Sequence, residues 1–468
     1  MTASFEDFAR RVYPFLEIHP FHKAYYRVLD AFANGIIRRL IITMPPQHGK
    51  SLGASVMLPA YMLGLNPDLR VAIASYSATL ASRFNRRAQR ILESSEYGQM
   101  FPGTAIKKNG TRGSYIRTAD QAEIIGHQGE LFSVGREGSL TGNRVDIFIL
   151  DDLYKDAMEA SSPLIRENCW DWYTSVVKTR MHNDSAELIV FTRWHEEDLI
   201  GRIGKREKIV PLTRWEQLGQ SGEDWLLLNF EALKTSPPTP IDPRTEGEAL
   251  WPQQHSAELL TAKRRLDPQR FECMYQGRPS SRDELLYGSG FKTYHDLPAA
   301  VVRRANYTDT ADTGDDFLCS VCYVVDTEGM IYITDMVYSR QPMEVTERAV
   351  ADMINRNGTR QACVESNNGG RGFARAVARL APLAAVSWFH QSANKEARIL
   401  SNSATVMRNI IMPADWNMRW PDFHNHISTY RRMFRSNRWH DAADVLTGIV
   451  EREIAAGSFR IKAVGFKD

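Results

Sequence analysis

The feature that most constrains the fold of this chain is a series of short apolar segments that alternate with amphipathic helical segments. Four of these apolar segments, residues 39–44, 71–76, 145–150 and 187–191, have the length of buried strands. Fully apolar strands joined by helices are typical of a parallel sheet with helices on both faces. The first part of the chain is therefore predicted to be an α/β domain with a doubly wound parallel sheet.

The first strand leads directly into a Gly-Lys-Ser turn and then into a helical segment at 51–63. Backbone N–H groups at such a turn bind phosphate oxygens, so the turn predicts a P-loop. The predicted nucleotide-binding residues are Gln47, His48, Gly49, Lys50 and Ser51. Lys50 would hold the β- and γ-phosphates of ATP, and the Ser51 hydroxyl would reach Mg²⁺. Pro45 and Pro46 lack N–H groups, and a chance Gly-Lys-Ser turn is the alternative interpretation.

A second motif, the apolar strand at 145–150, ends in Asp151 and Asp152 about 100 residues after the turn. This is the expected Walker B partner of a P-loop, in which Asp151 would bind Mg²⁺ and Asp152 would orient or deprotonate the attacking water. Thr192 follows the next strand, where its hydroxyl can sense the γ-phosphate. The alternatives are a helix N-cap pair for the two acids and a strand-end cap for Thr192.

The second half of the chain carries acidic residues at the ends of predicted elements. The candidate metal ligands are Asp309 after a strand, Glu365 at the end of the strand 361–365, and Asp441 and Asp444 at the start of the last helix. Clustered carboxylates are costly without a cation, and Mg²⁺ or Mn²⁺ would neutralise them and support phosphodiester cleavage. The order strand–Asp, strand–Glu, helix–Asp fits an RNase H-like nuclease. Rivals for the first position are Asp312, Asp315 and Asp316, and each acid taken alone is more often a surface residue.

The composition is that of a globular protein with a net charge of only +2. Basic residues are concentrated between Arg371 and Arg438, where there are eleven of them against three acidic residues. This stretch is either a set of solvated helix faces or a phosphate-contacting surface. Five scattered cysteines predict no disulfide framework, and no apolar run has the length of a membrane span. A soluble, cytoplasmic protein is expected, with Cys319 and Cys322 in a core.

Three regions are predicted from these patterns: a P-loop ATPase domain at 1–205, a helical lid and linker at 206–278, and an α/β nuclease domain at 279–468. The lid is inferred from weak strand signals after residue 201, a Pro-rich patch at 236–240 and a helical run at 256–273. The nuclease domain would begin with a β-meander at 304–309, 318–326 and 330–338, followed by a helix at 343–356.

With these residues in view, the chain resembles the large terminase subunits of bacteriophages over nearly its whole length. The matching segments are the PPxHGKS loop at 45–51, Ala74-Ser-Tyr76, residues 140–146 leading into 149–152, residues 192–201, Asp309-Thr-Ala311, Glu365 and residues 440–444. Two departures stand out. Relatives often carry Glu where this chain has Asp152, and often have adjacent acids where Ala442 follows Asp441.

The resemblance implies a RecA-like (ASCE) ATPase that drives double-stranded DNA into a procapsid and a Mg²⁺- or Mn²⁺-dependent endonuclease that cuts concatemeric DNA when packaging starts and ends. It implies a homo-oligomeric ring, expected to be a pentamer, on the portal protein, with a small terminase subunit as a further partner. The protein would act in the host cytoplasm and at the procapsid portal, and would be absent from the mature virion. An arginine from a neighbouring subunit would complete the ATP site, with Arg144 as the first candidate and Arg136 as the reserve.

Three other functions share some of these features. An ATP-dependent helicase with an attached nuclease would need a second RecA-like domain, which the second half does not provide. A non-catalytic scaffold would not require intact Lys50, Asp151 and Asp309. A transposase or resolvase would leave the P-loop domain unexplained.

Overall fold

The computed structural model describes residues 3–455, except 109–113, 141, 143, 221, 280–284, 312–315, 367–369, 393, 434 and 436. The chain divides into two compact units, Met1–Ser280 and Ser281–Asp468. The predicted division of the first unit into an ATPase domain and a separate lid stays a prediction. Among the described residues, none of the helices combines the length and the apolar character needed to cross a bilayer.

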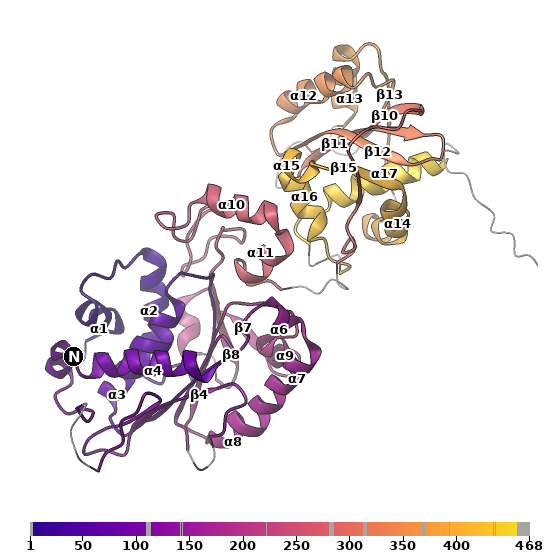
Figure 1. Ribbon diagram of the computed structural model, residues 1–468. Coiled ribbons are helices and arrows are strands. Elements are labelled where there is room, and N and C mark those ends of the chain that lie inside the picture. Colours follow the sequence, from indigo (N-terminus) through magenta and orange to yellow (C-terminus); the bar gives the residue numbers. More distant parts are fainter. Residues whose placement is uncertain are drawn as a thin grey trace, which may run out of the picture. The chain divides into compact units, whose positions relative to one another are not determined.

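The first unit is built on a sheet with the strand order β3-β4-β2-β5-β6-β1-β8-β7, in which every neighbouring pair except β3 and β4 is parallel (Figure 1). Its strands are β1 (Arg39–Thr43), β2 (Arg70–Ser75), β3 (Gln121–Glu123), β4 (Glu130–Gly135), β5 (Ile147–Asp151), β6 (Ala186–Phe191), β7 (Ile209–Pro211) and β8 (Trp225–Asn229). The four predicted strands are therefore confirmed as the central part of a parallel sheet.

The helices of the first unit pack on the sheet through two apolar clusters, one on each face. The first cluster includes side chains of α1 (Phe5–Val12), α2 (Pro20–Ala33), α3 (Leu58–Leu65), α4 (Ala78–Leu92) and α5 (Ser95–Met100). The second includes side chains of α6 (Ala157–Ser161), α7 (Pro163–Trp172) and α9 (Leu199–Gly204). Between β1 and α3, residues Leu52–Met57 form a π-helix, and a second π-helix, Tyr173–Val177, precedes α8 (Lys178–Arg180).

The stretch predicted to be a helical lid differs from the prediction in one respect: it supplies two strands to the sheet. β8 pairs with β1 in parallel, and β7 pairs with β8, so both extend the sheet beyond β1. A short 3-10 helix, Trp215–Gly219, lies between them. The predicted helical run at 256–273 forms two helices, α10 (Ala257–Leu266) and α11 (Pro268–Met274), because Pro268 disfavours a helical backbone at Asp267.

The second unit contains a sheet with the strand order β14-β13-β10-β11-β12-β15-β9. Its strands are β9 (Lys292–Tyr294), β10 (Val301–Asp309), β11 (Leu318–Asp326), β12 (Ile331–Ser339), β13 (Gln361–Glu365), β14 (Ala385–Phe389) and β15 (Ile410–Pro413). β10, β11 and β12 form the predicted antiparallel meander, while β13 pairs in parallel with β10 and β14 in parallel with β13. This arrangement is RNase H-like, as predicted.

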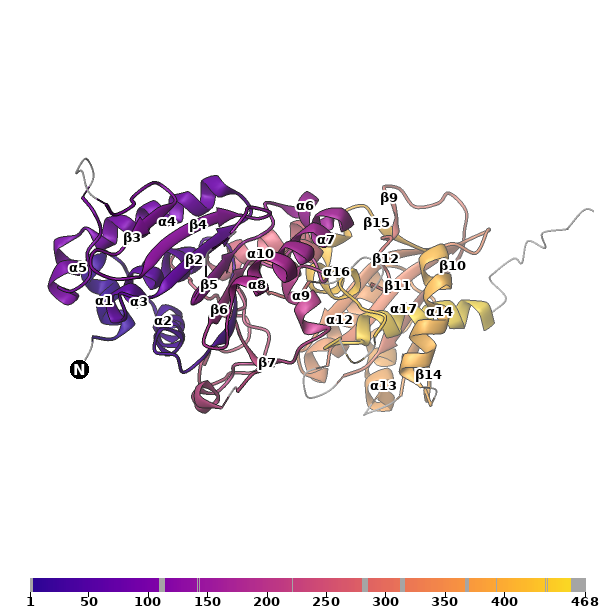
Figure 2. The same cartoon turned by 90° about the horizontal axis from the view of Figure 1, so that it is seen from below.

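Helices cover both faces of the second sheet (Figures 1 and 2). One face carries α12 (Met343–Arg356) and α13 (Gly370–Leu380), and the other carries α14 (Lys395–Asn409), α16 (Pro421–Ser428) and α17 (Asp441–Ala455), with the short α15 (Trp416–Arg419) before α16. The five cysteines, including Cys319 and Cys322, are all buried. The predicted core role of that pair is therefore confirmed.

Helix α17 reaches β10 closely because a glycine lies at the contact. A Cβ atom at Gly448 would lie 2.2 Å from the Tyr307 hydroxyl oxygen, whereas a Cβ at the helical Gly372 of α13 would meet nothing within 4 Å. This contact sets the distance between α17 and the strand that ends in Asp309.

We predict opposite effects for alanine at these two glycines. Gly448→Ala should cost about 1–3 kcal/mol of stability through overpacking against Tyr307, although alanine is the better helix former. Gly372→Ala should be neutral or gain up to about 1 kcal/mol. Hydrogen exchange of β10 and α17 peptides in the whole chain measures both effects. Equal protection in the two variants would contradict the close contact.

Candidate active sites

The first candidate site is the loop between β1 and the π-helix at Leu52–Met57. Gln47 and Gly49 have positive φ angles of 63° and 82°, which fold the loop tightly. Two loop carbonyls are engaged by side chains: the His48 Nδ1 atom is 2.8 Å from the Pro46 oxygen, and the Tyr25 hydroxyl donates to the Lys50 oxygen at 2.6 Å. These two contacts fix the backbone on both sides of Gly49.

The side chain of His48 points into the protein and is fully buried. Its ring stacks on that of His255, with the ring centroids 4.6 Å apart. Burial lowers the pKa of His48 to about 4, so the ring is neutral at pH 7. Only the backbone N–H of His48 is therefore placed to serve as the predicted phosphate donor.

Lys50 lies between the two acids that follow β5. Its Nζ atom forms an ion pair with Asp152 and lies 3.7 Å from Asp151 Oδ1. Burial alone would lower the pKa of the Lys50 ammonium, but attraction from Asp152 and Asp151 outweighs burial and raises it. The structure therefore brings together the lysine of the predicted P-loop and both acids of the predicted Walker B strand.

Two hydroxyl groups hold the Asp151 carboxylate. Ser51 Oγ donates to Oδ1 at 3.1 Å, and Ser55 Oγ donates to Oδ2 from the π-helix. Burial raises the pKa of Asp151 to about 6, against the opposing effect of Lys50. The sequence analysis missed Ser55, because its partner is 96 residues away and only the fold brings the two together.

Asp152 and Thr192 are joined at the ends of β5 and β6. The Thr192 N–H donates to Asp152 Oδ1 at 2.7 Å, and the Asp152 N–H donates to the Val190 oxygen at 3.1 Å. Asp152 has a φ angle of 43°, a left-handed conformation that is uncommon outside glycine. The hydrogen bond therefore connects Asp152, the second acid of the predicted Walker B strand, to Thr192, which is predicted to sense the γ-phosphate.

The two arginines predicted to act on a neighbouring subunit differ in exposure. The Arg144 side chain is 62% exposed and its Nε atom lies 3.5 Å from Asp146. Arg136 is largely buried, and its Nη1 atom donates to the Leu153 oxygen and to Glu159. Of the two, only Arg144 is free to extend from the surface of its own unit.

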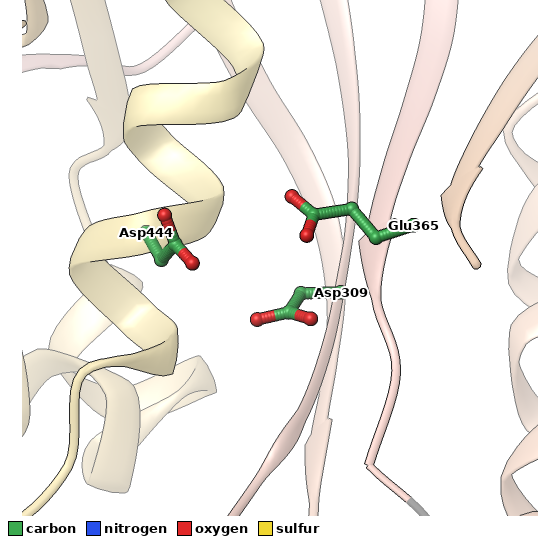
Figure 3. A group of neighbouring side chains, drawn as sticks. All are labelled: Asp309, Glu365 and Asp444. Carbon is green, nitrogen blue, oxygen red and sulfur yellow. The ribbon is translucent and has the colours of Figure 1, made fainter. Parts of the chain in front are cut away.

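The second candidate site is a group of three carboxylates on three elements of the second unit (Figure 3). Asp309 ends β10, Glu365 ends β13, and Asp444 lies in the first turn of α17. One oxygen from each lies within 4.8 Å of the others, which is close enough to hold a metal ion. The donor set consists of oxygen atoms only, which fits Mg²⁺ or Mn²⁺.

Asp441 lies beside this group and is not a member of it. Its Oδ2 atom accepts the Phe317 N–H at 3.0 Å, and its Oδ1 atom faces Lys395 at 3.2 Å. Asp316, a rival for the first position, is exposed, and the other rivals, Asp312 and Asp315, lie outside the described residues. The predicted ligand roles of Asp441 and of the three clustered acids stay predictions.

The charge of the carboxylates is partly offset by two basic residues of α14 that the sequence analysis did not assign to the site. Lys395 Nζ lies 3.7 Å from Asp309, 3.2 Å from Asp441 and 3.2 Å from Asp444. Arg398 donates to Asp444 at 3.0 Å and is itself held by Glu451 at 2.8 Å. Their spacing of three residues on one helix face was the available signal.

Burial and mutual repulsion change the proton affinity of these acids. Burial raises the pKa of Asp309 well above its usual range, and the nearby Glu365, Asp444 and Asp441 raise it further against the attraction of Lys395. Burial also raises the pKa of Glu365, although the Tyr307 hydroxyl donates to this carboxylate and opposes the shift. The arrangement is therefore short of positive charge, as a cation-binding site would be.

We predict that Ser55→Ala destabilises the nucleotide-free first unit by about 1.5–3 kcal/mol at pH 7, because ionised Asp151 loses a hydrogen bond. The effect should shrink as the pH falls below about 6, since Asp151 then becomes protonated. Hydrogen exchange of β5 peptides at pH 5 and pH 7 tests this. Ser133→Ala, whose hydroxyl bonds to a backbone oxygen, is the control and should show no such dependence.

We also predict that Lys395→Met lowers the melting temperature of the metal-free protein, with a cost of about 2 kcal/mol after discounting for the 34% exposure of the Lys395 side chain. Added Mn²⁺ should stabilise this variant more than the wild type, because the cation no longer competes with the ammonium group. Lys292→Met is the control, since the Lys292 ammonium group donates to the Arg408 carbonyl oxygen at 3.3 Å. Equal increases in melting temperature on addition of Mn²⁺ to all three proteins would contradict a competition between Mn²⁺ and the Lys395 ammonium group.

Residues 41–264 match the family described as terminase large subunit, T4likevirus-type, N-terminal. No curated protein matches the sequence. Among solved structures, the large terminase of a thermophilic bacteriophage is 10% identical over 92% of this chain and 98% of that chain, with a TM-score of 0.34.

Two solved structures of single domains are also similar. The large terminase ATPase domain of Thermus phage P74-26 is 16% identical over 59% of this chain and 100% of that chain, with a TM-score of 0.37. The nuclease domain of the large terminase subunit gp2 of bacterial virus Sf6 is 11% identical over 32% of this chain and 88% of that chain, with a TM-score of 0.25. The family match spans the Gly-Lys-Ser turn, the Asp151–Asp152 pair and Thr192, so these candidate residues lie in a stretch that is similar to the N-terminal part of terminase large subunits.

Proposed function

We propose that this chain hydrolyses ATP to drive double-stranded viral DNA into a procapsid and cleaves concatemeric DNA at the start and the end of packaging. The observation that carries the proposal is that one chain contains two units, each with a separate cluster of charged residues at the end of its central strands. The first cluster has the composition of an ATP site, and the second has the composition of a metal-dependent nuclease site.

In the ATPase reaction, the backbone N–H groups from Gln47 to Ser51 bind the phosphates and Lys50 leaves Asp152 to contact the β- and γ-phosphates. The release of Asp152 from this ion pair frees its carboxylate to orient the attacking water. Thr192, which donates its backbone N–H to Asp152, then reports the loss of the γ-phosphate. Mg²⁺ held by Ser51 and Asp151 would neutralise charge that develops on the phosphates.

In the nuclease reaction, Asp309, Glu365 and Asp444 would hold Mg²⁺ or Mn²⁺, with Asp441 at the margin of the site. A bound divalent cation would supply an activated water and stabilise the leaving oxygen. Arg398 keeps Asp444 oriented, because Glu451 fixes the guanidinium from its other side. The Tyr307 hydroxyl orients Glu365 in the same way.

The proposed partners are double-stranded DNA, the portal protein and a small terminase subunit. We propose a homo-oligomeric ring, a pentamer, that assembles on the portal in the host cytoplasm and is absent from the mature virion. The exposed Arg144 is the residue that we propose to reach the ATP site of the neighbouring subunit. A helicase with an attached nuclease would hydrolyse ATP without binding the portal, so a portal-binding assay separates the two functions.

The two activities should be lost independently. Lys50→Ala should reduce DNA-stimulated ATP hydrolysis by roughly 10²-fold or more while Mn²⁺-dependent plasmid cleavage continues. Asp309→Asn should do the reverse, because it removes a ligand charge from the carboxylate site only. ATPase and plasmid-cleavage assays on the whole chain measure both.

The matched controls are Lys205→Ala and Asp316→Asn. Lys205 is an exposed lysine that pairs with Glu197, and Asp316 is an exposed acid close in sequence to Asp309. Both controls should keep both activities. If Asp316→Asn abolishes cleavage and Asp309→Asn does not, the assignment of the first carboxylate is wrong.

A further inference from the structure

Helix α13 packs on the face of the second sheet opposite to α14 and α17, and it presents a row of arginines to solvent. Arg371, Arg375 and Arg379 are four residues apart, so they share one helix face, and all three are exposed. Among the described residues, no carboxylate forms an ion pair with Arg371 or Arg375. Arg379, one turn further along, lies near enough to Glu347 to stabilise its carboxylate. The two arginines at the start of the helix therefore offer positive charge to an outside partner.

An exposed aromatic ring adjoins this row. Trp388 lies on β14, which is the edge strand of the sheet, and its side chain is 43% exposed. The Arg375 guanidinium lies over the indole, with Cζ 6.0 Å from the ring centroid. The neighbouring inward residue, Val386, packs on the cluster formed by α12 and α13, which places Trp388 on the same face of the sheet as α13.

This surface begins at the edge of the sheet that carries the metal-binding carboxylates. Trp388 is paired with Val364, and the following residue, Phe389, is paired with Glu365. Gly370, the first residue of α13, is so close to the Glu365 carbonyl that an added Cβ would lie 2.1 Å from this oxygen. A DNA strand that passes from the carboxylates over the carboxyl end of β13 to the other face of the sheet would meet Arg371 first, and then Arg375 and Trp388.

We propose that Arg371, Arg375 and Trp388 bind an unpaired strand of DNA next to the cleavage site, with the arginines on phosphates and the indole stacked on a base. The proposal rests on the proposed nuclease function, and it adds that the DNA substrate is single-stranded next to the cleavage site. Inside a duplex both faces of a base are covered by its neighbours, whereas an unpaired base exposes its faces and is able to stack on Trp388. The unpaired charge of the two arginines favours a polyanion over an apolar protein surface, although Leu380 and Leu383 are exposed nearby.

The proposal is tested by the binding of the whole chain to two DNAs with the same duplex sequence. One DNA is blunt, and the other carries a single-stranded tail of twelve nucleotides. Binding is measured by fluorescence anisotropy in EDTA, so that no cleavage occurs. The wild type should bind the tailed DNA more tightly than the blunt DNA. Trp388→Ala should weaken binding of the tailed DNA by about 5- to 100-fold and leave the blunt DNA unaffected, while Trp388→Phe should keep most of the preference.

The charge contribution is tested by salt dependence. Arg375→Gln should reduce the slope of log affinity against log salt for the tailed DNA by about 0.7, the value of one released single-strand phosphate contact. Arg379→Gln is the matched control, because it lies on the same face beside Glu347, and it should leave the slope unchanged. Equal slopes for wild type and Arg375→Gln would overturn the phosphate contact.

The remaining outcomes distinguish a failure of the proposed single-strand binding from a failure of the proposed nuclease function. If the wild type shows no preference for the tail, or if Trp388→Ala keeps the full preference, the proposal is wrong even where Mn²⁺-dependent plasmid cleavage is present. If cleavage is absent but the Trp388-dependent preference is found, the proposed binding of single-stranded DNA is supported and the proposed nuclease function is wrong. If Trp388→Ala alters only self-association in sedimentation, the face is a protein interface and the proposal is overturned.

Discussion

Each unit of this protein depends on a lysine ammonium held among carboxylates at the carboxyl end of its central strands. Lys50 lies between Asp151 and Asp152, and Lys395 lies among Asp309, Asp441 and Asp444. Several acids at one sheet edge would repel one another and lose hydration, so they fold together only with a compensating cation. Both units therefore keep their functional acids in place by the same electrostatic means.

The topology explains why the acids meet. β5 and β6 are parallel neighbours, so Asp151, Asp152 and Thr192 emerge at the same edge as the end of β1 and the loop that contains Lys50. In the second unit β10 and β13 are parallel, so Asp309 and Glu365 also end together, and the start of α17 adds Asp444. The close contact at Gly448 then fixes how near α17 lies to the strands.

Much of this could be predicted from the sequence, because the acids and the Gly-Lys-Ser turn follow apolar strands whose direction is fixed by the helices between them. The trio Asp309, Glu365 and Asp444 is an example, although whether Asp441 or Asp444 completes it depends on the rotation of α17, which the sequence alone does not define. Strands β7 and β8 were missed because one is three residues long and the other follows a polar segment. Ser55, Lys395 and Tyr307 were missed because their partners are distant in sequence.

The two lysines differ in how much freedom the structure leaves them. Lys50 is 7% exposed and belongs to the loop that would bind phosphates, so its charge would stay in the site and change partner on nucleotide binding. Lys395 is the first residue of α14 and a third of its side chain is exposed, so its ammonium is free to swing out. Arg398, one turn later, is fixed by Glu451 and holds Asp444 throughout. A divalent cation at these carboxylates would therefore replace the charge of Lys395 alone, because the Arg398–Asp444 ion pair would remain in place.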